Sequence, residues 1–259
     1  MSAAAAVATA APASTAPILR CRGLTKRFGG LVAVNNVDLD LAPGEVLALV
    51  GDNGAGKSTM VQMISGVFRS DGGTIELDGE PRIFNSPEDA RAAGIETIYQ
   101  DLALCDNLTA ADNIFLGREI RRRRFGFLPG LNQPEMKQKA RTVLDELHIR
   151  IPDLDAPVRQ LSGGQRQAVA ISRAVYWQAR IMIMDEPTAA LGVPEQRKVM
   201  DLIRMLKSRG VPVILISHNM QDVFEISDRI FVMRRGSKVG DFATAQTEPN
   251  EVVRTMIGG

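Results

Sequence analysis

The chain has 259 residues, which suits one or two domains with a substantial buried core. Apolar residues make up 45% of it and charged residues 24%, and 31 basic against 30 acidic residues leave a net charge of +1. These values exclude a disordered, collagen-like or strongly basic protein. No run approaches the roughly 18 consecutive apolar residues that a membrane-spanning helix needs. The two cysteines, Cys21 and Cys105, predict neither a disulfide framework nor a cysteine-rich zinc site.

The first elements along the chain are a tail and two strands. Residues 1–17 are rich in alanine, interrupted by serine, threonine and proline, and we expect a flexible tail. Residues 31–41 alternate between apolar and polar side chains, which predicts a half-buried strand. Residues 45–50 form a short apolar run that ends in a glycine-rich loop, and a helical pattern follows. This order predicts strand, loop and helix.

The middle of the chain has a different pattern. Residues 86–178 are mostly of helical period, most clearly at 134–147, and predict a helical subdomain inserted into a single domain of residues 18–259. The apolar runs at 180–184 and 211–217 are typical of central parallel strands covered on both faces. The ends of the chain therefore share one α/β core.

One run of like charge stands out, in the loop-like stretch that contains residues 121–124, which are four arginines. Such a short run favours a solvated surface over a lipid or nucleic-acid contact. We therefore expect no nucleic-acid partner.

A phosphate-binding loop lies between the second predicted strand and its helix. Its residues fit the pattern G-x-x-x-x-G-K-[ST], and they are Gly51, Asp52, Asn53, Gly54, Ala55, Gly56, Lys57 and Ser58. The three glycines let backbone N–H groups approach phosphate oxygens, and the following helix adds the positive end of its dipole. We expect Lys57 to reach the β- and γ-phosphates, Ser58 to bind Mg²⁺ and Thr59 to support the α-phosphate side.

Two adjacent carboxylates end the predicted strand at 180–184. Asp185 is placed to hold the Mg²⁺, and Glu186 is the candidate to orient or deprotonate the water that attacks the γ-phosphate. Because side chains alternate along an extended chain, we expect the two carboxylates to point in different directions. An acidic pair alone would indicate only a surface feature. The phosphate loop earlier in the chain is what indicates a role in nucleotide chemistry.

A further motif makes the family recognisable. Leu161 is followed by Ser162, Gly163, Gly164 and Gln165, a helical segment comes next, and the acidic strand follows. Together with the phosphate loop, this order resembles the ABC-type ATPases over most of residues 18–240. The resemblance implies a P-loop NTPase core with a mixed sheet, an antiparallel β subdomain and an inserted helical subdomain.

The resemblance also implies roles for residues outside the phosphate loop. Gln100 stands at the position of a loop glutamine that contacts Mg²⁺ and the reacting end of the nucleotide, and His218 at that of a histidine that contacts the γ-phosphate. Phe28 matches an aromatic that stacks on adenine. The motif at 162–165 is implied to complete the nucleotide pocket of a second copy, so a homodimer holds two ATP molecules. Gly192 departs from the family, in which many members have an aspartate at this position.

Within the family, residues 85–95 and 113–118 resemble bacterial ATPases that energise monosaccharide import, with a likeness to members associated with fructose. That implies a membrane permease, an external sugar-binding protein as an indirect partner, and a peripheral place on the cytoplasmic face of the inner membrane. Apolar side chains at 102–108 are either exposed for docking the permease or part of the subdomain core. A branched-chain amino-acid importer and a soluble ABC ATPase without a transporter are the alternatives.

Overall fold

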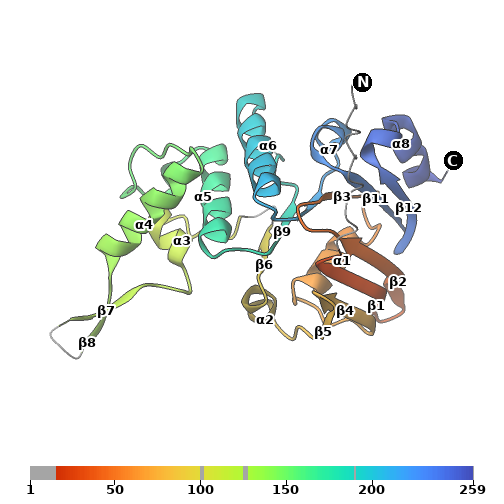
Figure 1. The fold of residues 1–259 in the computed structure, drawn as a ribbon, viewed down its shortest axis with the longest axis horizontal. Helices are drawn as coiled ribbons and strands as arrows, with labels where there is room; N and C mark the ends of the chain where they lie inside the picture. Colours follow the sequence, from red (N-terminus) through yellow and green to blue (C-terminus); the bar gives the residue numbers. More distant parts are fainter. Residues whose placement is uncertain (1–15, 100–101, 125–127, 190, 259) are drawn as a thin grey trace, which may run out of the picture.

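The computed structural model describes residues 16–99, 102–124, 128–189 and 191–258, so most of the expected tail lies outside it. A six-stranded sheet forms the centre (Figure 1). Its strands, in spatial order, are β12 (Ser237–Ala243), β11 (Arg229–Arg234), β3 (Val46–Val50), β10 (Val213–Ile216), β9 (Ile181–Asp185) and β6 (Ile95–Ile98). All neighbours pair in parallel except β12, which runs antiparallel to β11.

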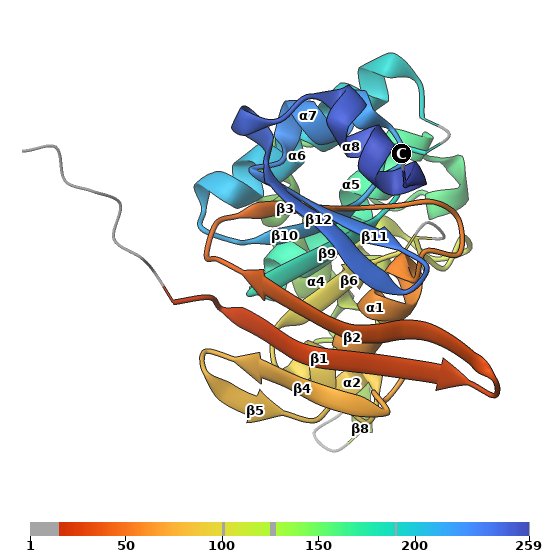
Figure 2. The same cartoon turned by 90° about the vertical axis from the view of Figure 1, so that its right-hand side faces the viewer.

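A second, four-stranded sheet is antiparallel. Its order is β2 (Leu31–Leu41), β1 (Leu19–Phe28), β4 (Gly72–Leu77) and β5 (Glu80–Arg82). Figure 2 shows this sheet on one side of the central sheet, with helix α1 (Lys57–Ile64) between them. Buried side chains of both sheets and of α1 form one apolar cluster, which includes Leu39, Met60 and Ile214. The mixed sheet and the antiparallel subdomain predicted from the sequence are confirmed.

The other face of the central sheet is covered by helices α5 (Gly163–Tyr176), α6 (Val193–Ser208), α7 (Met220–Ile226) and α8 (Pro249–Ile257). Helices α3 (Ala110–Phe115) and α4 (Gln133–Glu146) pack against α5, farther from the sheet (Figure 1). Helices α3 to α6 share a second apolar cluster with β9 and β10, whereas α7 and α8 pack on β11 around Val223, Ile230 and Val252. None of the helices in the described ranges is long and apolar enough to cross a membrane.

The segment predicted to be a helical insertion is more varied than its periodicity suggests. Helix α2 (Pro87–Ala92) and strand β6 belong with the central sheet, since β6 pairs with β9. The helical group consists of α3, α4 and α5, and its exact boundary stays a prediction. The expected loop at 121–124 is in fact a strand, β7 (Arg121–Arg124), which pairs with β8 (Leu128–Leu131) in a hairpin.

One arginine links the two sheets. The Arg229 guanidinium, at the start of β11, donates to Glu45 at 2.6 Å, to Asp241 at 3.0 Å and to the Asp40 carbonyl in β2. The side chains of Arg229 and Glu45 are only 25% and 12% exposed. Burial alone would lower the pKa of Arg229, but the hydrogen bonds and charges of Glu45 and Asp241 raise it above its usual value. The network fixes the antiparallel sheet to the edge of the core.

We expect Arg229→Ala to lower the free energy of unfolding by about 2–4 kcal/mol, because it leaves the buried Glu45 carboxylate without its cationic partner, with only the Ala42 N–H still donating to it. The matched control is Arg180→Ala, whose pair with Asp78 is about half exposed and contributes at most about 1 kcal/mol. Urea denaturation of both variants measures the difference. Equal losses would contradict a special role for the Arg229 network.

The backbone around the loop between β3 and α1 is closely packed. A Cβ on Gly56 would lie 2.4 Å from the Ala33 carbonyl oxygen, and one on Gly51 would lie 2.2 Å from the Met233 carbonyl oxygen. A Cβ on Gly54 would meet nothing within 4 Å, although its φ of +78° is also positive. Gly51 and Gly56 are thus required by protein packing, and Gly54 by its backbone angle alone.

This difference predicts two unequal alanine substitutions. Gly54→Ala adds only backbone strain and should cost about 1 kcal/mol, whereas Gly56→Ala adds a clash with β2 and should cost about 3 kcal/mol or more. Thermal unfolding in the absence of ligand tests the order. Equal costs would show that the loop can move away from β2 without penalty.

Candidate active site

Residues 53–58 of the phosphate loop predicted from the sequence line a cavity of about 600 Å³ together with Thr59, whereas Gly51 and Asp52 do not line it. Strand β3 leads into the loop and α1 begins at Lys57, as expected for this motif. The lining of the cavity consists of Phe28, Leu31, Val32, Ala33, Asn53, Gly54, Ala55, Gly56, Lys57, Ser58, Thr59, Asp185, Glu186, Ile216 and Arg235. One cavity therefore joins the loop, the acidic pair and the predicted aromatic residue.

The charged groups of this cavity act on each other. Lys57 Nζ donates to the carbonyls of Gly51 at 2.6 Å and Asp52 at 3.0 Å, so the ammonium lies over the loop. Burial lowers the pKa of Lys57, against the opposing effects of Glu186 and Asp185. Burial also raises the pKa of Asp185, the neighbouring Glu186 charge raises it further, and Lys57 opposes both. The Lys57 ammonium suits an anionic ligand, and the Asp185 carboxylate suits a cation that the ligand brings with it.

Glu186 and His218 meet at the end of the central sheet. Glu186 follows β9 and His218 follows β10, and the two strands are neighbours. Glu186 Oε2 lies 2.6 Å from His218 Nδ1, and the Glu186 N–H donates to the Ile216 carbonyl at 2.9 Å. Glu186 has a φ of +51°, which lies in the left-handed region. The direction of its side chain is therefore set by this backbone angle and not by the strand alternation expected from the sequence. This backbone turns its carboxylate toward the histidine.

Phe28 lies at the end of β1 and forms part of the cavity wall together with residues 31–33 of β2. The residue is 41% exposed, and its ring makes an edge contact with Phe68, with 5.2 Å between ring centroids. An exposed ring held by a neighbour offers a flat apolar surface for a base.

The remaining predicted residues lie elsewhere. Gln100 falls outside the described residues. Ser162 caps α5, where its hydroxyl accepts from the Gln165 N–H while the Gln165 side chain accepts from the Ser162 N–H at 2.9 Å. Residues 162, 164 and 165 line a separate cavity of about 720 Å³ between α5, α6 and the end of α4. The structure of one chain therefore does not bring residues 162–165 to the phosphate loop.

Gly192, the departure from the family pattern, is the N-cap of α6 and makes no side-chain cap. A Cβ added to Gly192 would lie 2.9 Å from a carboxylate oxygen of Glu195.

The residues at 102–108 do not form a fully exposed docking surface. Leu102 and Leu104 are half-buried against the cluster of α3 to α6, which favours the alternative that they belong to the subdomain core.

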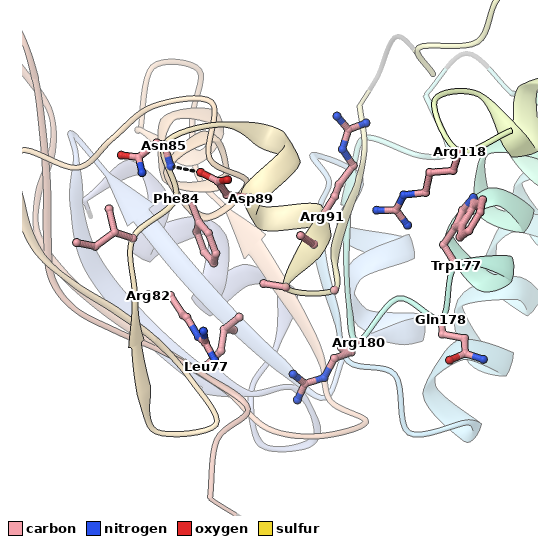
Figure 3. Close-up of a pocket in the computed structure, with 14 residues that line it drawn as sticks. Leu77, Arg82, Phe84, Asn85, Asp89, Arg91, Arg118, Trp177, Gln178 and Arg180 are labelled. Atoms are coloured by element: carbon pink, nitrogen blue, oxygen red, sulfur yellow. Dashed lines mark hydrogen bonds between the residues drawn. The ribbon is translucent and has the colours of Figure 1, made fainter.

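A larger hollow lies elsewhere, with a volume of about 910 Å³ (Figure 3). Four arginines from different elements line it, namely Arg82, Arg91, Arg118 and Arg180. Three of them form ion pairs with Asp78, Glu88 and Glu96, and Arg118 also stacks on Trp177 at 4.9 Å. Without a phosphate loop or a free acidic pair, this hollow lacks the chemistry of the smaller cavity.

Sequence reasoning missed Arg235, which reaches the cavity from the turn between β11 and β12. No motif marks this residue, because its approach depends on pairing between distant strands. Leu31, Val32 and Ala33 were predicted as strand residues but not as cavity wall.

Several known proteins are similar to this chain in sequence. A Rhizobium meliloti protein named fructose import ATP-binding protein FrcA is 51% identical over 226 residues, 86% of this chain and 87% of that protein. A Sulfolobus acidocaldarius protein named xylose/arabinose import ATP-binding protein XylG is 47% identical over 239 residues, 92% of this chain and 93% of that protein. A ribose import ATP-binding protein of Rubrobacter xylanophilus is 45% identical over 93% of this chain, which spans 46% of that protein.

Solved structures agree with the fold. A nucleotide-free ATP-binding cassette from an ABC transporter has a TM-score of 0.78 at 24% identity and covers 94% of this chain and 96% of its own. A dimeric ATP-binding cassette in a post-hydrolysis state, bound to ADP and Pi, has a TM-score of 0.71 at 26% identity and covers 87% of this chain and 98% of its own. The ABC transporter family model matches residues 34–189, a span that begins in β2 and ends after the acidic pair, and the chain therefore belongs to the ABC transporter family.

Proposed function

We propose that this chain is the ATP-hydrolysing subunit of an importer for a simple sugar. The observation that carries the proposal is one cavity that joins the phosphate loop, the base-stacking ring and the acidic pair beside His218. The relatives described above are named for fructose, xylose/arabinose and ribose import, which supports a monosaccharide as the transported substrate. No relative described above is named for amino-acid import.

ATP binding follows from the two walls of the cavity. The loop N–H groups and the first turn of α1 bind the phosphates, and Lys57 moves from the loop carbonyls to the β- and γ-phosphates. Phe28 stacks on the adenine. The apolar residues of β2 beside Phe28 exclude water from the base.

Mg²⁺ fits this donor set when it arrives with the nucleotide. Ser58 and Asp185 line the same cavity, and Gln100 is the third ligand expected from the family. The described residues hold no cluster of three or more histidine, cysteine or acidic side chains, so phosphate and water oxygens must complete the shell. When bound, the ion would neutralise phosphate charge, and its positive charge beside Asp185 would oppose the effects of burial and of Glu186 that raise the pKa of this carboxyl.

Glu186 and His218 position and activate the water that attacks the γ-phosphate. The Glu186 carboxylate accepts a proton or a hydrogen bond from that water, and its contact with His218 keeps it oriented. His218 is exposed, with 73% of its side chain accessible, and can therefore turn its other ring nitrogen toward a γ-phosphate.

Two copies of the chain are needed for a complete site. Ser162 and the following backbone N–H groups open α5, and such a helix start binds anions. Since it lies in a different cavity from the phosphate loop, its ligand must come from another molecule. The dimeric relative bound to ADP and Pi supports a homodimer with two nucleotides between the subunits.

The transport partner is a membrane permease, with an external sugar-binding protein acting through it. A hollow of about 580 Å³ at the end of β6 is lined by Tyr99, the last described residue before Gln100, and offers a docking place. Val67 and Leu116 in its lining are more than one-third exposed and apolar. Docking there places the chain as a peripheral subunit on the cytoplasmic face of the inner membrane.

Two substitutions separate binding from turnover. Lys57→Ala should weaken ATP binding by roughly tenfold or more, because it removes the cation of the phosphate site. Glu186→Gln should keep ATP binding and lower turnover by roughly 100-fold or more, because it removes the general base. Phosphate release and equilibrium binding measure the two effects. Glu80→Gln, an exposed carboxylate in β5 that lines neither the phosphate-loop cavity nor the cavity at Ser162, is the control, and normal turnover in both site variants would refute the assignment.

The transported substrate is tested in cells. We expect a Lys57→Ala allele to abolish uptake of one monosaccharide from a radiolabelled panel of pentoses and hexoses that includes fructose. Uptake of the other sugars and of branched-chain amino acids should not change. Loss of amino-acid uptake instead would establish the amino-acid importer, and unchanged uptake throughout, with the protein expressed, would favour an ATPase without a transporter.

A further inference from the structure

The turn between β11 and β12 carries an unusual residue. Arg235 and Gly236 form its centre, with φ angles of +48° and +79°. Two-residue turns with positive φ at both central positions favour asparagine, aspartate or glycine at the first of them. An arginine in the left-handed region costs stability, because its Cβ crowds the following carbonyl. A strained residue of this kind calls for a functional reason.

Backbone contacts hold this turn against the phosphate loop. The Gly236 N–H donates to the Ala55 carbonyl at 2.9 Å, and the Gly236 carbonyl accepts from the Asn35 N–H at 2.8 Å. A Cβ on Gly56 would also lie 3.4 Å from the Gly236 Cα. The turn is therefore fixed between the phosphate loop and β2, which form the two walls of the nucleotide cavity.

Arg235 and its neighbour Arg234 have different surroundings. Arg234 donates to the Thr255 carbonyl at 3.2 Å and packs against Gly258, so its guanidinium is directed to α8. Arg235 is exposed, lines the nucleotide cavity, and takes part in none of the ion pairs found in the described part of the chain. Its charge remains available to a ligand.

We propose that Arg235 binds the phosphate chain of the nucleotide, as a second cation beside Lys57. The inference rests on the proposed ATP site and adds a residue from outside the phosphate loop. The turn is bonded to both the loop and β2, and Arg235 lines the cavity between them, through which the phosphate chain of a nucleotide stacked on Phe28 would run. Arginine suits this task because its planar donors match phosphate oxygens.

The test uses the substitution Arg235→Asn, since asparagine suits the turn but cannot reach the phosphates. We expect binding of ADP and of a non-hydrolysable ATP analogue, measured by titration calorimetry, to weaken roughly tenfold at low salt. The difference should shrink as salt screens the contact. The midpoint of thermal unfolding without ligand should rise by about 1–3 °C, since turn strain is relieved.

Two further variants control the interpretation. Arg235→Lys keeps the charge and should stay within about threefold of the wild-type affinity, and Arg234→Ala removes an equal charge one residue away and should bind normally. The proposal is overturned if Arg235→Asn binds as the wild type does, if Arg234→Ala loses as much affinity, or if Arg235→Asn lowers the unfolding midpoint as well. Failure of the wild-type chain to bind either nucleotide would overturn the proposed function itself.

Discussion

Close backbone packing around the phosphate loop is the constraint on which the rest of the structure depends. Carbonyl oxygens of Met233 and Ala33 lie where side chains on Gly51 and Gly56 would be, and Gly236 donates to Ala55. These contacts bring β3, the β11–β12 turn and the antiparallel sheet to one place. The loop is therefore shaped by three segments distant in sequence, and it needs little rearrangement when a phosphate binds, which keeps the entropic cost of binding low. The Arg229 network holds the same two sheets together at their other end.

The order of strands in the central sheet then decides which side chains meet. Strands β3, β10 and β9 are parallel neighbours, so their carboxyl ends lie at one edge. The phosphate loop follows β3, His218 follows β10, and Asp185 ends β9, which places all three at that edge. Ligands bind at this edge in open α/β sheets because loops diverge there and helix N-termini face it. The low exposure of the strands also explains the raised pKa of Asp185, since burial disfavours its charged form.

The sequence predicted what local patterns encode and missed what distant contacts create. The phosphate loop, the acidic pair and the parallel strands were predicted because each has a short pattern of residue types, and the structure assembles them into one cavity with Phe28. The left-handed Glu186 and the approach of Arg235 have no such pattern, since each depends on hydrogen bonds or pairing with another strand. The hairpin at 121–131 was missed because four arginines resemble a solvated loop until their pairing partner is known.

Under the proposed function, the helix start at Ser162 makes one chain an incomplete enzyme. The Gln165 side chain is engaged with the Ser162 N–H and the Arg150 carbonyl, so it shapes the start of α5 rather than offering itself to a ligand. The Ser162 oxygen accepts from the Gln165 N–H, which leaves its hydroxyl proton free to donate. Together with the positive end of the helix dipole, that donor is suited to a phosphate, yet the phosphate loop of the same chain faces another cavity. In the proposed homodimer, the second subunit would supply the missing donors only when the two approach closely, and hydrolysis would thereby be linked to a change of shape that a membrane partner can use.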